Sequence, residues 1–371
     1  MERTTELSPS PPAPPAEGTA NMQRFFIALL GLAVLFYLLW LGFDFLKTTT
    51  APQIVIALFA IVWGVGGVAL LFTLANVLVE SLSNKWRDRI QPYVFVGPAV
   101  AFLGVFLFVP ALQTLWQSFF DASSTNFIGL DNFSAVFTNR LMQQAFVNNL
   151  IWLVVGTGLC VVFGLLIAVL ADRSRFESVA KAMIFLPMAI SFVGAGVIWR
   201  FIYAYAPPSD PQIGVLNAIV VSFGGQPQAW LTESPWNTLF LIVVLVWIQT
   251  GFAMVIFSAA LKGVPGELLE AARLDGASEI QSFFKVIIPY IQGTIITVMT
   301  TIAIFTLKIF DVVIVMTGGQ YDSNVIATQF YREFFSNRNF GYGSAIAIVL
   351  FIAVLPVMYY NLRQLRKQEG F

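Results

Sequence analysis

Long uninterrupted runs of apolar residues alternate with short polar segments along this 371-residue chain. A helix needs about 20 predominantly apolar residues to cross the hydrocarbon core of a bilayer, and eight runs reach roughly that length. The predicted spans are, in order, Phe25–Phe43, Ile54–Val79, Val94–Phe119, Leu150–Ala171, Ala182–Tyr203, Thr238–Leu261, Ile291–Thr317 and Ala345–Leu362. Because the runs are continuous and do not alternate with a period of two, they indicate helices rather than barrel strands. The pattern therefore predicts an all-α polytopic membrane protein with about eight transmembrane helices.

Composition supports this class and excludes several chemistries. Hydrophobic residues make up 58% of the chain and charged residues only 11%, whereas soluble domains carry about 25% charged residues. There is no histidine, and the one cysteine, Cys160, lies in an apolar run, where a small buried side chain is expected. No P-loop or dinucleotide fingerprint is present. The net charge is zero, and the sequence has no block of basic residues that would suggest binding to nucleic acid. We therefore expect no enzyme, no catalytic residue, no metal site and no cofactor bound by this chain; any ATP and Mg²⁺ would be held by a partner.

The distribution of positive charge predicts the orientation in the membrane. If the N-terminus lies inside, the cytoplasmic segments hold fourteen Lys and Arg residues and the outer loops hold four. This asymmetry places both termini in the cytoplasm. Residues 1–21 are rich in Pro, Ser and Thr and predict a disordered cytoplasmic tail. The first span lacks a small-residue cleavage site after it, so it is interpreted as an anchor rather than a signal peptide.

One long polar loop separates the sixth and seventh spans. Pro265 stands where a helix can begin, and residues 267–274 are good helix formers. Asp275 and Gly276 break that run, and Ser278 with Gln281 has the spacing of a capping box that opens a second helix. The loop therefore predicts a compact helix-turn-helix on the cytoplasmic face, suited to docking on another protein. The alternative is an amphipathic helix resting on the bilayer, although lipid binding would favour a more basic face.

The residues of this loop resemble the EAA motif of bacterial ABC-importer permeases. The match consists of Glu270-Ala271-Ala272, Asp275-Gly276-Ala277 and Ile288-Pro289, with Ile288 where leucine is usual. Flanking segments resemble the carbohydrate-uptake branch of maltose and alpha-glucoside type; they are 127–133, 213–217, 229–231, 310–313 and 317–319. The resemblance implies the ABC type I importer permease fold. It divides the chain into two extra N-terminal transmembrane helices with a connector (22–90) and a six-helix permease core (91–371) containing the EAA loop (262–289).

The resemblance also implies a function and a set of partners. The chain would be the membrane permease subunit of a sugar importer in the bacterial inner membrane and would form half of the translocation pathway. Its partners would be a second permease subunit, an ATP-binding-cassette ATPase dimer, an extracytoplasmic sugar-binding protein, the sugar and the lipid bilayer. By position in the motif, the residues implied to couple the permease to the ATPase are Glu270, Ala271, Ala272, Arg273, Asp275 and Gly276.

Candidates for the substrate pathway lie in the sixth and seventh spans. Sugar recognition needs aromatic faces for the ring and hydrogen-bonding groups for the hydroxyls within otherwise apolar helices. The residues that offer these groups, or that match the family's substrate positions, are Trp247, Gln249, Phe252, Phe305, Thr306, Lys308, Ile309 and Asp311. Lys308 and Asp311 are three residues apart, so they would lie on one face of a helix and could form an ion pair. The alternative is that both side chains contact sugar hydroxyls. Arg200 is expected to extend from the outer end of its span toward the membrane surface.

Two other classes of protein remain open at this level. A secondary (ion-coupled) solute transporter often uses an intramembrane carboxylate as a proton relay, and Asp311 is such a carboxylate. A membrane-anchored scaffold or sensor would move no solute. The sugar itself is not determined: trehalose, sucrose, maltose, glucosylglycerol and sugar phosphates such as glycerol phosphate all remain candidates.

Overall fold

The computed structural model of the protein describes residues 21–368, so the predicted tail, except for its last residue, Asn21, lies outside the described residues. The chain forms two compact units, one ending at Ala111 and the other beginning at Leu112. This division falls within the third predicted span, whereas the core was expected to begin at residue 91; the domain assignment stays a prediction.

The first unit is built from long apolar helices. They are α1 (Met22–Thr48), α2 (Gln53–Glu80) and α3 (Asn84–Leu103), which runs on through a π-helical turn, η1 (Gly104–Phe108). Helices α1 and α2 pack closely where glycine leaves room. A Cβ on Gly42 would stand 1.9 Å from Trp63 Nε1, so the indole occupies the space that a side chain would need. This close packing makes the first two spans a hairpin of helices.

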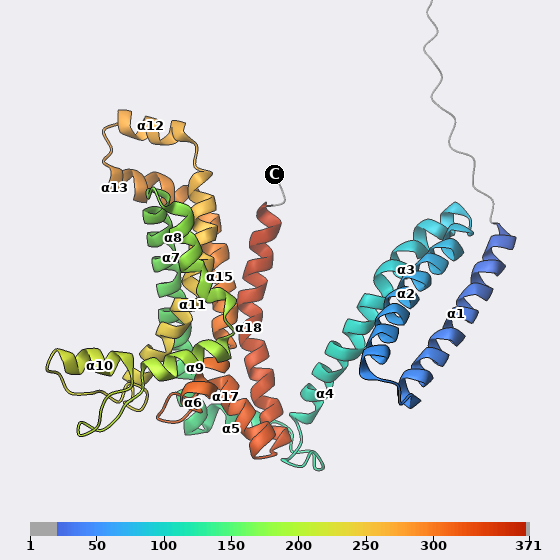
Figure 1. Ribbon diagram of the computed structural model, residues 1–371, viewed down its shortest axis with the longest axis horizontal. Helices are drawn as coiled ribbons and strands as arrows, with labels where there is room; N and C mark the ends of the chain where they lie inside the picture. Colours follow the sequence, from blue (N-terminus) through green and yellow to red (C-terminus); the bar gives the residue numbers. More distant parts are fainter. Residues whose placement is uncertain (1–20, 369–371) are drawn as a thin grey trace, which may run out of the picture. The chain divides into compact units, whose positions relative to one another are not determined.

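The second unit is a helical bundle whose two ends carry different short helices (Figure 1). Its elements are α4 (Val109–Gln117, shared with the first unit), α5 (Asp131–Thr138), α6 (Arg140–Ile151), η2 (Trp152–Gly156), α7 (Thr157–Asp172), α8 (Glu177–Phe185), η3 (Leu186–Ala189), α9 (Phe192–Ile202), α10 (Val215–Ser222), α11 (Trp236–Lys262), α12 (Gly266–Leu274), α13 (Glu279–Ser282), η4 (Phe283–Ile287), α14 (Ile288–Tyr290), α15 (Gln292–Leu307), α16 (Asp311–Met316), α17 (Ile326–Tyr331), η5 (Arg332–Ser336) and α18 (Phe340–Gln368). Helices α12 and α13 lie at one end, and α9, α10, α5 and α17 lie at the other (Figure 1). We refer to these as the α12 end and the α10 end.

The count of eight spans is confirmed, but two spans are not the straight helices that the apolar runs predicted. Six described helices are long and apolar enough to cross a membrane, and the number rises to as many as 8 when each of two bent helix pairs is counted as one span. The predicted fifth span bends by 102° between Ala189 and Phe192, where Ser191 caps α9 by accepting from the Gly194 N–H at 3.0 Å. The predicted seventh span ends at Leu307, and Asp311 begins a separate helix, α16. A hydropathy run cannot reveal either break because bent and straight spans are equally apolar.

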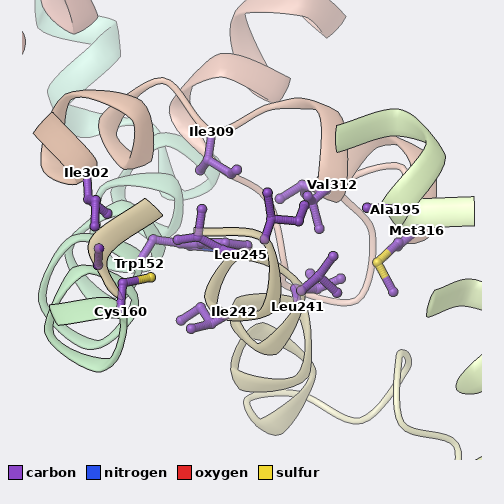
Figure 2. Packing of buried hydrophobic residues seen from close by; sticks show 14 of the residues in the cluster. Trp152, Cys160, Ala195, Leu241, Ile242, Leu245, Ile302, Ile309, Val312 and Met316 are labelled. Atoms are coloured by element: carbon purple, nitrogen blue, oxygen red, sulfur yellow. The ribbon is translucent and has the colours of Figure 1, made fainter. Parts of the chain in front are cut away.

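The core of the second unit surrounds α11, which packs against α7 over most of its length. Buried side chains from α7, α11, α15 and α16 meet there (Figure 2). Small residues bring the helices together: a Cβ on Gly164 would lie 2.4 Å from the Ala253 Cβ, and one on Gly251 would lie 2.5 Å from the Ile184 carbonyl oxygen. Cys160 is completely buried in this core, which confirms the expectation of a packed side chain.

Two adjacent asparagines of α6 hold the broken part of the seventh span. Asn149 donates to the Leu307 carbonyl at 3.1 Å and accepts from the Ile326 N–H at 2.8 Å. Asn148 donates to the Asp322 carbonyl at 2.6 Å and to the Asn324 carbonyl at 2.7 Å. Backbone groups that a helix break leaves unpaired thus find partners on α6. Sequence reasoning placed these asparagines at the edge of a loop and missed this role.

Candidate functional site

The polar loop between α11 and α15 folds as its sequence predicted. Helix α12 has Pro265 as its N-cap, and Ser278 and Gln281 form a capping box at the start of α13. The turn between the helices is a Schellman motif: Ala277 N–H donates to the Ala272 carbonyl and Gly276 N–H to the Arg273 carbonyl, both at 3.0 Å. Gly276 has φ of +80°, a left-handed conformation that suits glycine. We call residues 266–282 the α12–α13 hairpin.

The hairpin presents a mixed acidic and apolar surface. Glu270 and Asp275 are exposed, and neither carboxylate has a hydrogen-bond or ion-pair partner among the described residues. Leu274, which is 90% exposed, directly precedes Asp275 in the chain, and Ile280, which is 71% exposed, lies in α13. Sequence reasoning singled out the acids but missed these two apolar residues, whose exposure the helix-turn-helix pattern alone does not reveal. An apolar tip flanked by free carboxylates is typical of a protein-docking surface.

Of the other predicted coupling residues, one is buried and one is paired within the chain. Ala272 is only 9% exposed, whereas Ala271 is exposed on α12. Arg273 Nη2 lies 3.0 Å from Glu279 Oε1, and Arg173 Nη2, at the end of α7, lies 3.7 Å from Glu279 Oε2. Glu279 therefore links the two helices of the hairpin to each other and to the bundle. The prediction did not include it.

A second charged cluster lies at the α12 end, beside the last turn of α11. Lys181 of α8 lies 2.5 Å from both Asp172 Oδ1 and Glu177 Oε1. Lys262, the last residue of α11, also pairs with Glu177, and Ser258 donates to Asp172 Oδ1 at 2.7 Å. We call these five residues the Lys181 cluster. It ties α7, α8 and α11 together one residue before the segment that leads into the hairpin. The i,i+4 spacing of Glu177 and Lys181 was the available signal in the sequence.

The predicted pathway residues of α11 divide between opposite faces. Gln249 and Phe252, three apart, share one face of the helix, whereas Trp247 is turned away from Gln249 by about 200°. Trp247 instead packs edge-to-face against Trp199, with ring centroids 5.8 Å apart. Gln249 is only 5% exposed as a whole residue, and its side-chain amide makes no hydrogen bond with the described residues. The amide therefore keeps its donors and acceptor unused within this part of the chain.

The candidate pathway residues around the end of α15 divide into exposed and buried residues. Phe305 is 51% exposed and Lys308 is exposed three residues later. Thr306 is completely buried and Ile309 is 5% exposed, so both belong to the packed core; the Thr306 hydroxyl donates to the Ile302 carbonyl at 2.8 Å.

The prediction that Lys308 and Asp311 form an ion pair on one helical face is wrong. Lys308 follows the last residue of α15 and Asp311 opens α16, so the two residues do not share a helix. Neither side chain has an ion-pair partner among the described residues.

Comparison with known proteins agrees with this architecture. Residues 160–368 match the model of the family described as binding-protein-dependent transport system inner membrane component. An osmoprotective compounds uptake permease protein of Synechocystis sp. is 51% identical over 276 residues, which cover 74% of this chain and 99% of that protein. An alpha-glucoside transport system permease protein of Rhizobium meliloti is 48% identical over 293 residues, 79% of this chain and 87% of that protein. A crystal structure of a bacterial ABC transporter involved in the import of the acidic polysaccharide alginate contains a chain with the same fold. That chain gives a TM-score of 0.65 at 22% identity, with 76% of this chain and 98% of that chain covered.

The helical bundle with its protruding hairpin is thus an importer permease in architecture. The chain belongs to the binding-protein-dependent transport system inner membrane components, a family of multi-pass transport subunits rather than catalytic enzymes. The predicted fold and family are confirmed.

Proposed function

We propose that this chain is the permease subunit of an ABC importer for an oligosaccharide or alpha-glucoside. An extracytoplasmic binding protein delivers the sugar, the α10 end faces outward, and both termini lie in the cytoplasm. The α12–α13 hairpin docks on a cytoplasmic ATPase dimer, so that closure of the ATPase moves the helices around a mid-membrane site. The names of the two relatives, an alpha-glucoside permease and a permease for osmoprotective compounds, support this class of substrate.

The observation that carries the proposal is the form of the hairpin. Its turn is held by backbone hydrogen bonds and its second helix by a capping box, so it is a rigid element rather than a flexible loop. Leu274 and the unpaired carboxylates of Glu270 and Asp275 remain free for a partner. The Lys181 cluster fixes the end of α11 from which the hairpin emerges. Movement of the hairpin would therefore be transmitted to α7, α8 and α11 together.

A second permease subunit is part of the proposal. A companion permease would complete the pathway, since one bundle provides only one wall.

For the substrate we propose the face of α11 that carries Gln249 and Phe252, with Phe305, Lys308 and Asp311 nearer the break after α15. The Gln249 amide lacks a protein partner, and sugar hydroxyls can both donate to it and accept from it. The Phe252 and Phe305 rings offer the apolar surface that a sugar ring requires. The proposed site excludes Trp247, which packs against Trp199 on the opposite face of α11, and Thr306 and Ile309, which are buried in the core.

The test uses the chain assembled with its ATPase, its companion permease and its binding protein in proteoliposomes. Glu270→Lys should abolish sugar uptake and binding-protein-stimulated ATP hydrolysis while leaving insertion intact, because it reverses the charge of the docking surface. Gly276→Pro should do the same, because proline can neither adopt a φ of +80° nor donate the hydrogen bond to Arg273.

Glu267→Lys is the matched control, because Glu267 is also an exposed acid and lies on the first turn of α12. Normal uptake by the Glu270→Lys and Gly276→Pro variants would overturn the coupling assignment. Uptake that survives removal of ATP but stops when a proton uncoupler is added would instead favour a secondary transporter.

A further inference from the structure

The α10 end contains a cavity that the proposed mid-membrane pathway does not use. Its volume is about 850 Å³, and it is bounded by the end of α9, the loops on either side of α10 and the turn after α16. Cavities that bind small molecules measure roughly 300–1,000 Å³. Among the residues that line it are Arg200, Tyr205, Thr232 and Tyr321. We call it the outer cavity.

The polar groups at its rim are free to bind a ligand. Neither the Arg200 guanidinium nor the hydroxyl groups of Tyr205 and Tyr321 have a hydrogen-bond partner among the described residues, and the two tyrosines are 48% and 50% exposed. The floor differs: Tyr203 is 3% exposed, and its hydroxyl donates to the Phe240 carbonyl at 3.1 Å. The Tyr203 hydroxyl is thus occupied, whereas the rim keeps aromatic rings, hydroxyls and one cation. This is the chemistry that recognises a pyranose ring, with apolar ring faces for its C–H side and donors for its hydroxyls.

The walls of the cavity are held by a buried amide. Asn217 of α10 is fully buried and makes four hydrogen bonds that join the loop after α9 to the loop before α11. Its Nδ2 donates to the Ala204 and Gln228 carbonyls at 3.0 and 2.9 Å. Its Oδ1 accepts from the Gln228 N–H at 2.9 Å and from Trp230 Nε1 at 3.1 Å. Two loops tied in this way keep their shape without a ligand, as a preorganised binding site requires.

The remaining wall carries a tyrosine in an unusual conformation. Tyr321 has a φ of +54° and Asp322 a φ of +59°, both left-handed, which costs free energy in residues other than glycine. Hydrogen bonds maintain this turn: Asn237 donates to the Tyr321 carbonyl at 2.5 Å, and Asn148 donates to the Asp322 carbonyl at 2.6 Å. The α6 and α11 helices therefore hold the Tyr321 side chain at the rim of the outer cavity.

We propose that the outer cavity is a second saccharide site, in which the sugar binds after it leaves the binding protein and before it reaches mid-depth. A pyranose ring stacks on Tyr205 or Tyr321, and Arg200 donates to its hydroxyls. The proposal rests on the proposed function, because it takes the transported sugar as the ligand. It predicts that free sugar occupies this cavity even in the absence of the binding protein.

The test uses a single accessible thiol. Since Cys160 is fully buried, Thr232→Cys, at an exposed residue that lines the cavity, introduces a thiol that a membrane-impermeant maleimide can reach in this subunit of the assembled transporter. Maltose or trehalose, without binding protein, should slow its labelling, and sorbitol, which has no ring, should not. Arg140→Cys, at the exposed start of α6 and outside the cavity, should be unaffected by either sugar.

Arg200→Ala, combined with Thr232→Cys, should raise the sugar concentration needed for half-protection roughly tenfold to a hundredfold, the effect of losing one hydrogen bond from a charged donor. Arg140→Ala should leave that concentration unchanged. If sugar gives no protection while the binding protein alone blocks labelling, the cavity is a protein-docking surface and the proposal is wrong. ATP-dependent uptake by the unmodified transporter, measured in the same vesicles, tests the proposed function separately.

Discussion

Gly251 lies where the backbone of α11 closely approaches the backbone of the bent fifth span, and replacing it with alanine tests the packing of the bundle. An added Cβ would stand 2.5 Å from the Ile184 carbonyl oxygen and 2.8 Å from the Phe185 Cα. Both neighbours are backbone atoms and cannot move away by a change of rotamer. The methyl group must therefore push α11 away from α8. The displaced part of α11 lies two residues from Gln249, and the displaced part of α8 lies just before the 102° bend.

Two opposing terms determine the expected magnitude. Overpacking a well-packed core costs about 1–3 kcal/mol. Alanine is the better helix former, which returns about 1 kcal/mol or slightly less. Gly251→Ala should thus be destabilising by up to about 2 kcal/mol. Gly158→Ala is the matched control: Gly158 is also inside a helix, α7, and nothing lies within 4 Å of its would-be Cβ. That control should be stabilising by up to about 1 kcal/mol.

The measurement is thermal unfolding of the two variants in the same lipid nanodiscs, together with uptake in proteoliposomes. Gly251→Ala should unfold at a lower temperature than wild type and Gly158→Ala at the same or a higher temperature. Uptake should fall in the Gly251→Ala variant because the displaced helix carries Gln249. If Gly251→Ala is at least as stable as Gly158→Ala and transports normally, α11 and α8 do not approach as described.

Three further predictions concern other parts of the second unit. Asn149→Leu should lower the free energy of unfolding by roughly 2–4 kcal/mol in urea titration, because two buried backbone groups lose their partner; Arg140→Ala, at an exposed position of the same helix, should change it by less than about 0.5 kcal/mol. Lys181→Met should reduce the coupling of ATP hydrolysis to uptake, because the carboxylates of Asp172 and Glu177 then lose the cation between them and repel each other. Adding Asp172→Asn should restore part of the coupling. Cys160 should resist maleimide in the folded protein and react only after denaturation; rapid labelling of the native protein would contradict the packing of the core.

The α12–α13 hairpin was predictable from the sequence because short-range contacts specify it. Pro265 begins the first helix, Gly276 adopts the left-handed turn, and Ser278 and Gln281 cap the second helix, all through groups within a few residues of one another. The eight apolar runs were equally readable, since each span is long enough to cross the bilayer by itself. The opposition of Trp247 and Gln249 also follows from helical geometry, although the sequence reading grouped them.

The breaks in the spans and the outer cavity depend on contacts between distant parts of the chain. The end of α15 at Leu307 is stabilised by Asn149, 158 residues earlier, and the turn at Tyr321 by Asn237, 84 residues earlier. Hydropathy records how well a segment partitions into lipid, and that quantity is the same for a straight helix and a broken one. The sequence by itself therefore determined the membrane class, the number of spans and the capped hairpin. Only the tertiary structure decided where spans break and which polar groups remain unpaired, because unpaired backbone in a membrane depends on partners supplied by other helices.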